Sequence, residues 1–155
     1  MLGGAGEAGS ATLGGCRVVA GQDGLLICRE NRGIPAPVPV RPGLSLIWDR
    51  RFAIRFTAAA GEAENPRLAG LGAAGWSEIV RRRPSLKGGP LPGPVRASLP
   101  ALLDGAGVMA VPHLGYRRPA GAGTGVAFAE IRFSPPSPLA GNGFFLPNRP
   151  DILSL

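Results

Sequence analysis

The side chains best suited to chemistry in this sequence are its arginines. Of the 17 cationic residues 16 are arginine, and against 10 acids they give a net charge of +7. A guanidinium matches the geometry of phosphate, so a polyanionic partner is predicted. Individually, each arginine is interpreted equally well as an ordinary solvated charge. The candidate nucleic-acid-binding residues are Arg51, Arg55, Arg81, Arg82, Arg83, Arg96, Arg117 and Arg118.

These arginines would act by converging on one surface. Contacts to phosphate position a nucleic acid but do not read its sequence. No known base-reading motif is present, and aromatic residues, which stack on single strands, make up 6% of the chain.

No catalytic residue or metal site is predicted. The sequence contains no G-x-x-x-x-G-K-[ST], G-x-S-x-G, H-E-x-x-H or paired C-x-x-C motif. His113 is the sole histidine, and no nucleophile or second acid accompanies it. We therefore interpret His113 as a hydrogen-bonded structural residue rather than a catalyst. These residues leave open whether the chain belongs to an enzyme.

The two cysteines lie in a predicted β-hairpin. Residues 12–20 and 25–30 are β-prone runs on either side of the Gly/Asp turn 21–24. If Ala20 pairs with Gly24, Cys16 lies opposite Cys28. No secretory signal and no membrane-length apolar run is seen, so we expect a cytoplasmic protein without membrane contact. Two reduced core thiols side by side are then expected, rather than a disulfide.

The stretch WDRRFAIRF, residues 48–56, predicts a half-buried strand that carries three arginines. Alternate residues from Trp48 to Phe56 would face the core, with Arg50 as the single charge among them. The opposite face would present Arg51 and Arg55 to the phosphates of a polyanionic partner or to water. The preceding residues 34–43 alternate with proline, so they must be extended and can join a sheet only at its edge.

The remaining elements complete a small β-rich domain. A short helix is predicted from about Ala73 to Arg83, with Trp76, Ile79 and Val80 on one face and arginines in its last turn. A one-turn helix near residues 94–98, a hairpin over 99–116 and a strand over 125–133 follow. Five or six strands and one or two short helices indicate an α+β, β-rich fold, with a small mostly antiparallel sheet or a partly open barrel.

Composition divides the chain into three parts. Residues 1–11 are rich in Gly, Ala and Ser and are predicted to be a disordered linker or a truncation scar. Residues 12–133 are predicted to form the β-rich domain, and residues 134–155 an irregular proline-rich tail.

An ordered series of short strings resembles the C-terminal region of the alphaproteobacterial tRNA(Ile)-lysidine synthetases. The strings are TLGGCR at 12–17, CRE at 28–30, WDRRF at 48–52, LG at 71–72, LPALLD at 99–104 and VPHLGY at 111–116. The resemblance covers about residues 12–133. It departs at Arg50, where the family string has Gly, at Leu103, where Trp is frequent, and after Pro135, where nothing corresponds.

The resemblance implies a role in tRNA modification. That family uses ATP to activate the wobble cytidine of an isoleucine tRNA, and lysine then displaces AMP. Its ATP site is an S-G-G-x-D-S loop, which this sequence lacks. We therefore expect an accessory tRNA-binding region with no cofactor of its own, partnered by tRNA and by a catalytic domain that binds ATP and is missing from this chain. The alternative is a structural or protein-docking β module without RNA binding.

Overall fold

Antiparallel strands dominate the protein. The computed structural model describes residues 10–21, 24–119 and 124–136. Within these residues lie eleven strands in three antiparallel sheets, together with two α-helices and two 3-10 helices. The predicted β-rich α+β class is confirmed, and none of the sheets closes into a barrel.

Three strands with the order β11-β6-β5 form sheet C. They are β5 (Ser45–Trp48), β6 (Phe52–Ala58) and β11 (Val126–Phe133). In β6 the side chains alternate between the two faces as predicted: Phe52, Ile54 and Phe56 are buried, and Arg55 is exposed. The predicted strand over 125–133 is β11, which pairs with β6 along its whole length apart from a bulge at Ala129.

The predicted continuous strand from Trp48 to Phe56 is wrong, since the chain turns at Asp49–Arg51. Asp49 and Arg50 have φ of 49° and 55°, and the Arg51 N–H donates to the Trp48 carbonyl at 3.0 Å. Two successive residues with positive φ make a hairpin turn whose twist matches the strands on either side. Arg50 is therefore exposed at the turn and does not share the buried face of Trp48.

Replacing Arg50 by glycine should stabilise the protein. An arginine in the left-handed region is strained by about 1 kcal/mol, and Asp-Gly is a preferred pair for this turn. Arg50→Gly should therefore raise the free energy of unfolding by up to about 1 kcal/mol, measured by urea denaturation. Arg50→Ala removes the same charge without relieving the strain, so an equal gain from both variants would contradict this explanation.

Five strands with the order β10-β9-β8-β7-β4 form sheet B. They are β4 (Val38–Pro39), β7 (Arg67–Gly70), β8 (Pro100–Asp104), β9 (Gly107–Val111) and β10 (Tyr116–Arg117). The proline-rich segment joins this sheet at its edge through β4, as predicted. The predicted 99–116 hairpin is β8 and β9, after which the chain forms a 3-10 helix, Pro112–Leu114, before β10.

The helices also lie where the sequence pattern indicates. Helix α1 (Gly72–Arg82) buries Ile79 and Val80 and leaves Trp76 half-buried. The chain then forms a 3-10 helix, Pro84–Gly88, and the one-turn helix α2 (Gly93–Arg96). Among the described residues, no helix is long and apolar enough to cross a membrane.

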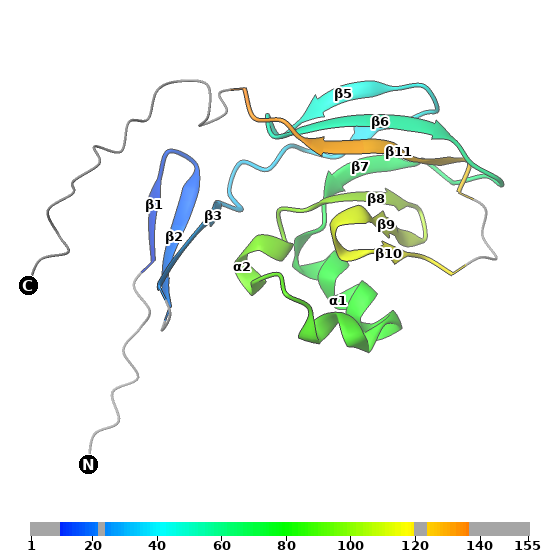
Figure 1. The fold of residues 1–155 in the computed structure, drawn as a ribbon. Coiled ribbons are helices and arrows are strands. Elements are labelled where there is room, and N and C mark those ends of the chain that lie inside the picture. Colours follow the sequence, from blue (N-terminus) through cyan, green and yellow to red (C-terminus); the bar gives the residue numbers. More distant parts are fainter. Residues whose placement is uncertain (1–9, 22–23, 120–123, 137–155) are drawn as a thin grey trace, which may run out of the picture.

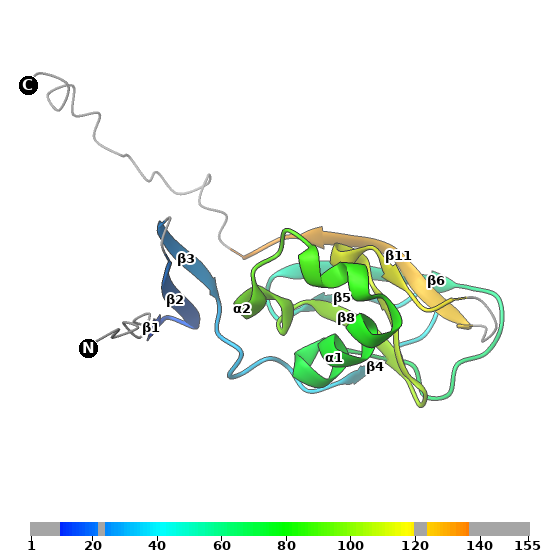
Figure 2. The same cartoon turned by 90° about the horizontal axis from the view of Figure 1, so that it is seen from below.

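Sheet C, sheet B and the helices form three successive layers (Figure 1). Trp48, Ile54 and Phe56 of sheet C pack against Leu68 and Leu102 of sheet B. The other face of sheet B, with Ala101, Val108 and Val111, packs against Ile79 of α1. Figure 2, seen from below, shows α1 and α2 in front of sheet B. Both faces of sheet B are therefore buried, whereas sheet C has one outer face.

Sheet A contains β1 (Ser10–Leu13), β2 (Cys16–Gly21) and β3 (Gly24–Arg29). The predicted hairpin is β2 and β3, and its Gln22 and Asp23 lie outside the described residues. Residues 1–9 of the predicted linker also lie outside them, whereas Ser10 and Ala11 belong to β1. Of the predicted tail, residues 137–155 lie outside the described residues, and residues 134–136 form neither helix nor strand.

The predicted pairing of the cysteines is wrong by one residue. Gly21 pairs with Gly24, so Cys16 lies opposite Arg29 and Arg17 lies opposite Cys28. A shift of one residue moves a side chain to the other face of the sheet. Cys28 is accordingly buried, whereas Cys16 is exposed, and both are free thiols.

Candidate nucleic-acid interface

Arg118 is committed to an ion pair inside the protein. Its two Nη atoms donate to the two oxygens of Asp104 at 2.8 and 2.9 Å, and its Nε donates to the Val108 carbonyl at 3.2 Å. Both side chains are less than a tenth exposed. The hydrogen bond from Arg118 lowers the pKa of Asp104, and the same bond raises the pKa of Arg118. This predicted nucleic-acid-binding residue is therefore not free for phosphate.

Arg51 is held by the turn in which it lies. Its Nε donates to Asp49 at 2.8 Å and its Nη2 to the Ser98 carbonyl at 3.0 Å. Asp49 also accepts from Arg29 at 3.0 Å, and Arg29 donates in addition to the Gly33 carbonyl. Asp49 thus ties sheet A to the β5–β6 turn, with half-buried guanidinium groups on both sides.

Arg96 is occupied as well. Its Nε donates to the Leu91 carbonyl at 2.9 Å, and its guanidinium lies 4.3 Å from the centroid of the Trp76 ring. A cation over an aromatic face stabilises local packing. Arg96 therefore fastens α2 to α1.

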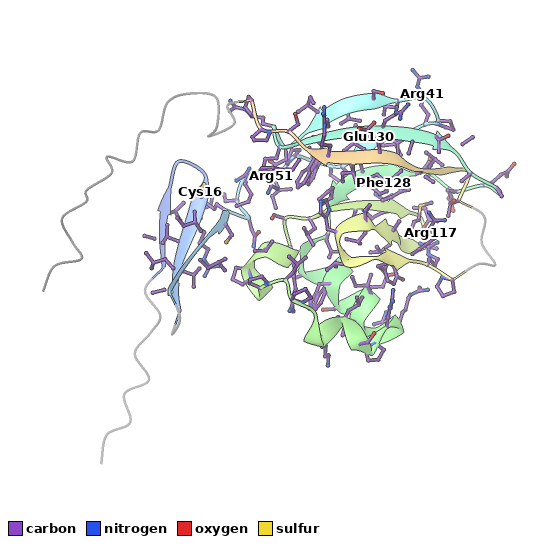
Figure 3. The ribbon with its side chains drawn as sticks, in the orientation of Figure 1. Cys16, Arg41, Arg51, Arg117, Phe128 and Glu130 are labelled. Atoms are coloured by element: carbon purple, nitrogen blue, oxygen red, sulfur yellow. The ribbon has the colours of Figure 1, made fainter. Side chains whose placement is uncertain are left out.

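Arg55 lies on the outer face of sheet C, as the alternation predicted. It pairs with Glu130 on β11 at 3.3 Å, and both side chains are more than half exposed. Such an exposed ion pair is weak, so Arg55 can leave Glu130 for another anion. The register places Arg132 in the next row, opposite Ala53. Arg132 was not singled out in the sequence, although the alternation of β11 could have indicated it. Figure 3 shows Arg41 near the end of this face.

Arg81, Arg82 and Arg83 meet a second segment of the chain. All three are exposed at the end of α1, as is Lys87 in the following 3-10 helix. We call these four residues the helix-end cluster. Arg83 donates to the Gly115 carbonyl at 2.9 Å, which brings the cluster beside β10. Tyr116 packs on the α1 side of sheet B, so the exposed Arg117 points to the opposite side, toward sheet C. The nearby acid is Glu78, which faces Arg82 at 3.4 Å.

The eight predicted arginines do not form one continuous surface. Arg51, Arg96 and Arg118 are engaged inside the fold, and Arg55 lies on the outer face of sheet C. Two sheets separate Arg55 from the helix-end cluster, because α1 covers the far face of sheet B. The structure therefore brings together Arg81, Arg82 and Arg83, and it adds Lys87, which the sequence analysis did not select. Arg117 lies around the β10 edge of sheet B, on the side that faces sheet C.

His113 has a packing role, and the hydrogen bond predicted for its ring is not found among the described residues. It is an exposed residue of the 3-10 helix after β9, and its ring meets the edge of Phe52 at 5.2 Å between centroids. Partial burial of the ring, and then the charge of Arg51, lower the pKa of His113, so its neutral form prevails at pH 7. Among the described residues, no three metal-ligating side chains come together.

A comparison of the chain with models of protein families, with curated proteins and with solved structures found no match.

Proposed function

We propose that this chain is an accessory C-terminal region of a tRNA(Ile)-lysidine synthetase and that it contributes to tRNA binding. The single observation that supports this most is the gathering of the four exposed cations of the helix-end cluster, from α1 and the following 3-10 helix, beside one acid, Glu78. Exposed cations from separate segments can follow successive phosphates of an RNA backbone. The resemblance of the ordered strings to that family indicates that the RNA is a tRNA.

Under this proposal the chain itself performs no chemical step. Catalysis and ATP belong to the partner catalytic domain, the ligand of this chain is tRNA, and the location is cytoplasmic. The buried and half-buried arginines, such as Arg118 and Arg51, stabilise the fold that presents the exposed ones.

The test compares two sets of three cations across a salt series. Arg81→Gln, Arg82→Gln and Lys87→Gln remove charge from the helix-end cluster and spare Arg83, which holds Gly115. If each residue contacts one phosphate, the slope of log affinity for tRNA against log salt should flatten by about three units.

The matched control removes three cations from the sheet C side, through Arg41→Gln, Arg55→Gln and Arg132→Gln. This variant should keep the salt slope of the wild type. Equal flattening by both triple variants would mean that only net charge matters, and an unchanged slope in the helix-end variant would contradict the proposed interface.

Protein docking is a second candidate function, and exposed apolar residues on sheet A favour it. Leu25 and Ile27 are 70% and 66% exposed, and both point to the same face of β3. In this case Leu25→Asp with Ile27→Asp should weaken binding to a separately supplied catalytic domain at least tenfold, measured by calorimetry. Tight tRNA binding with no measurable binding to that domain would count against it.

A further inference from the structure

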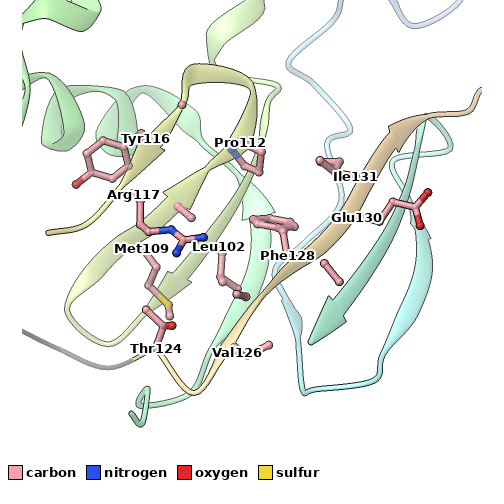
Figure 4. Close-up of a pocket in the computed structure, with 14 residues that line it drawn as sticks. Leu102, Met109, Pro112, Tyr116, Arg117, Thr124, Val126, Phe128, Glu130 and Ile131 are labelled. Carbon is pink, nitrogen blue, oxygen red and sulfur yellow. The ribbon is translucent and has the colours of Figure 1, made fainter. Parts of the chain in front are cut away.

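A cavity opens between the edges of sheets B and C. Its volume is about 360 Å³, within the range of small-ligand sites, and it lies between the β9–β10 end of sheet B and β11 of sheet C. Leu102, Met109 and Val126 line it and are at most 1% exposed, so its floor is apolar and well packed (Figure 4).

Two side chains of complementary chemistry face this cavity from opposite walls. Figure 4 shows the Arg117 guanidinium reaching in from β10 and the Phe128 ring reaching in from β11. Phe128 is half-buried and its position is fixed by Phe56, whose ring centroid lies 5.1 Å away. The aromatic wall is therefore preorganised before any ligand arrives.

Arg117 differs from its neighbour Arg118 in having a free guanidinium. Within the described residues no hydrogen bond or ion pair engages Arg117, whereas Arg118 forms a bidentate pair with Asp104. Glu130 also lines the cavity, but its carboxylate pairs with Arg55 at 3.3 Å. The cation is thus available to a ligand that enters the cavity.

We propose that this cavity binds a nucleobase, with Phe128 stacking on the base and Arg117 contacting its second face or the adjoining phosphate. A planar ring between a phenyl group and a guanidinium gains from stacking and from cation–π attraction at once. An aliphatic anion would use the arginine but gain less from the ring, so the pair favours a flat ligand.

The position of the cavity identifies an unpaired base of bound RNA as its source, and in this respect the inference rests on the proposed function. Arg117 follows two residues after Gly115, whose carbonyl holds Arg83 of the helix-end cluster. The cluster and the cavity lie on opposite faces of sheet B at its β10 edge, so an RNA strand that bends around this edge reaches from the cluster to the mouth of the cavity. A free nucleotide has the same chemistry and is the other possible source.

The first experiment uses the 155-residue chain and two RNA duplexes that differ by a single bulged adenosine. The bulged duplex should bind about tenfold tighter than the fully paired one, the gain typical of stacking one base on an aromatic ring. Phe128→Leu should abolish this preference while leaving the salt slope unchanged, and Phe128→Tyr should retain it. A preference that survives Phe128→Leu, or its absence in the wild-type protein, would overturn the RNA source.

The second experiment separates failure of this inference from failure of the proposed function. AMP is titrated into the isotope-labelled chain, and the NMR signals of Phe128 and of the Arg117 side chain are followed. If no RNA binds but AMP shifts these signals, the cavity is a nucleotide site and the tRNA proposal fails. If neither RNA nor AMP shifts them, the base-binding inference is wrong, whatever the tRNA affinity of the helix-end cluster.

A charge-matched control accompanies both measurements. Arg117→Met should remove the response to AMP and reduce the preference for the bulged duplex, whereas Arg17→Met on sheet A should change neither. Equal effects of the two variants would assign the response to net charge and overturn the role of Arg117. Thermal unfolding of each variant establishes that the comparison is made between folded proteins.

Discussion

Replacing Arg118 by methionine should lower the free energy of unfolding by about 3–5 kcal/mol, because the variant leaves the Asp104 carboxylate buried without its partner. Asp104 and Arg118 are both less than a tenth exposed and form two short hydrogen bonds. Urea denaturation at neutral pH measures the loss.

The double variant Asp104→Asn, Arg118→Met provides the control. Asparagine can still accept the Ala106 N–H that Asp104 accepts at 2.8 Å, and no charge remains unpaired. The double variant should therefore be more stable than Arg118→Met alone, giving a coupling energy of about 1–3 kcal/mol. Additive losses would show that the pair does not act as a unit.

The Asp104–Arg118 pair makes the stability of the protein depend on pH in the acidic range. The hydrogen bond from Arg118 lowers the pKa of Asp104 in the folded state. A folded-state pKa below the unfolded one contributes stability that is complete above about pH 4 and is lost as the pH falls through the folded value. The difference in stability between the wild type and Asp104→Asn should therefore shrink below pH 4.

Gly107→Ala should be the most damaging of the conservative glycine substitutions, lowering the free energy of unfolding by about 2–4 kcal/mol. Gly107 has φ of +114°, a conformation that residues with a Cβ rarely adopt, and an added Cβ would lie 2.5 Å from Oε2 of Glu78. The Glu78 carboxylate accepts the Val108 N–H at 3.2 Å, so moving it away leaves that donor unsatisfied.

Gly105→Ala is the matched control in the same turn. Its added Cβ would lie 3.1 Å from a Glu64 carboxylate oxygen, and its φ is not in the left-handed region. This variant should cost under about 1 kcal/mol. Similar losses in the two variants, measured by thermal denaturation, would contradict the argument from Gly107.

Local patterns predicted the elements well where one residue type dominates a short stretch. Prolines placed the 34–43 segment at a sheet edge, and apolar spacing predicted α1 with Ile79 and Val80 buried. The turn at Asp49–Arg50 was missed, because a favourable β pattern continues through it and neither residue is glycine. The cysteine register was missed by one residue for a similar reason, since the length of a loop cannot be read from composition.

The roles of the arginines were the least predictable part. Arg51 bonds to a carbonyl 47 residues away, and Arg55 pairs with an acid 75 residues away. Such partners depend on which strands become neighbours, and no pattern within one strand contains that information. The separation of Arg55 from the helix-end cluster likewise exists only after α1 has covered sheet B.

The sequence by itself determined that the chain is basic and β-rich, that glycine and proline interrupt its strands, and that a short helix ends in arginines. It also determined which faces are apolar, because all these features depend on residues within one turn or one strand. Only the tertiary structure decided which cations are free. Burial makes an unpaired charge costly, so the fold pairs the arginines that it encloses and leaves those at the end of α1 and on β10 in solvent.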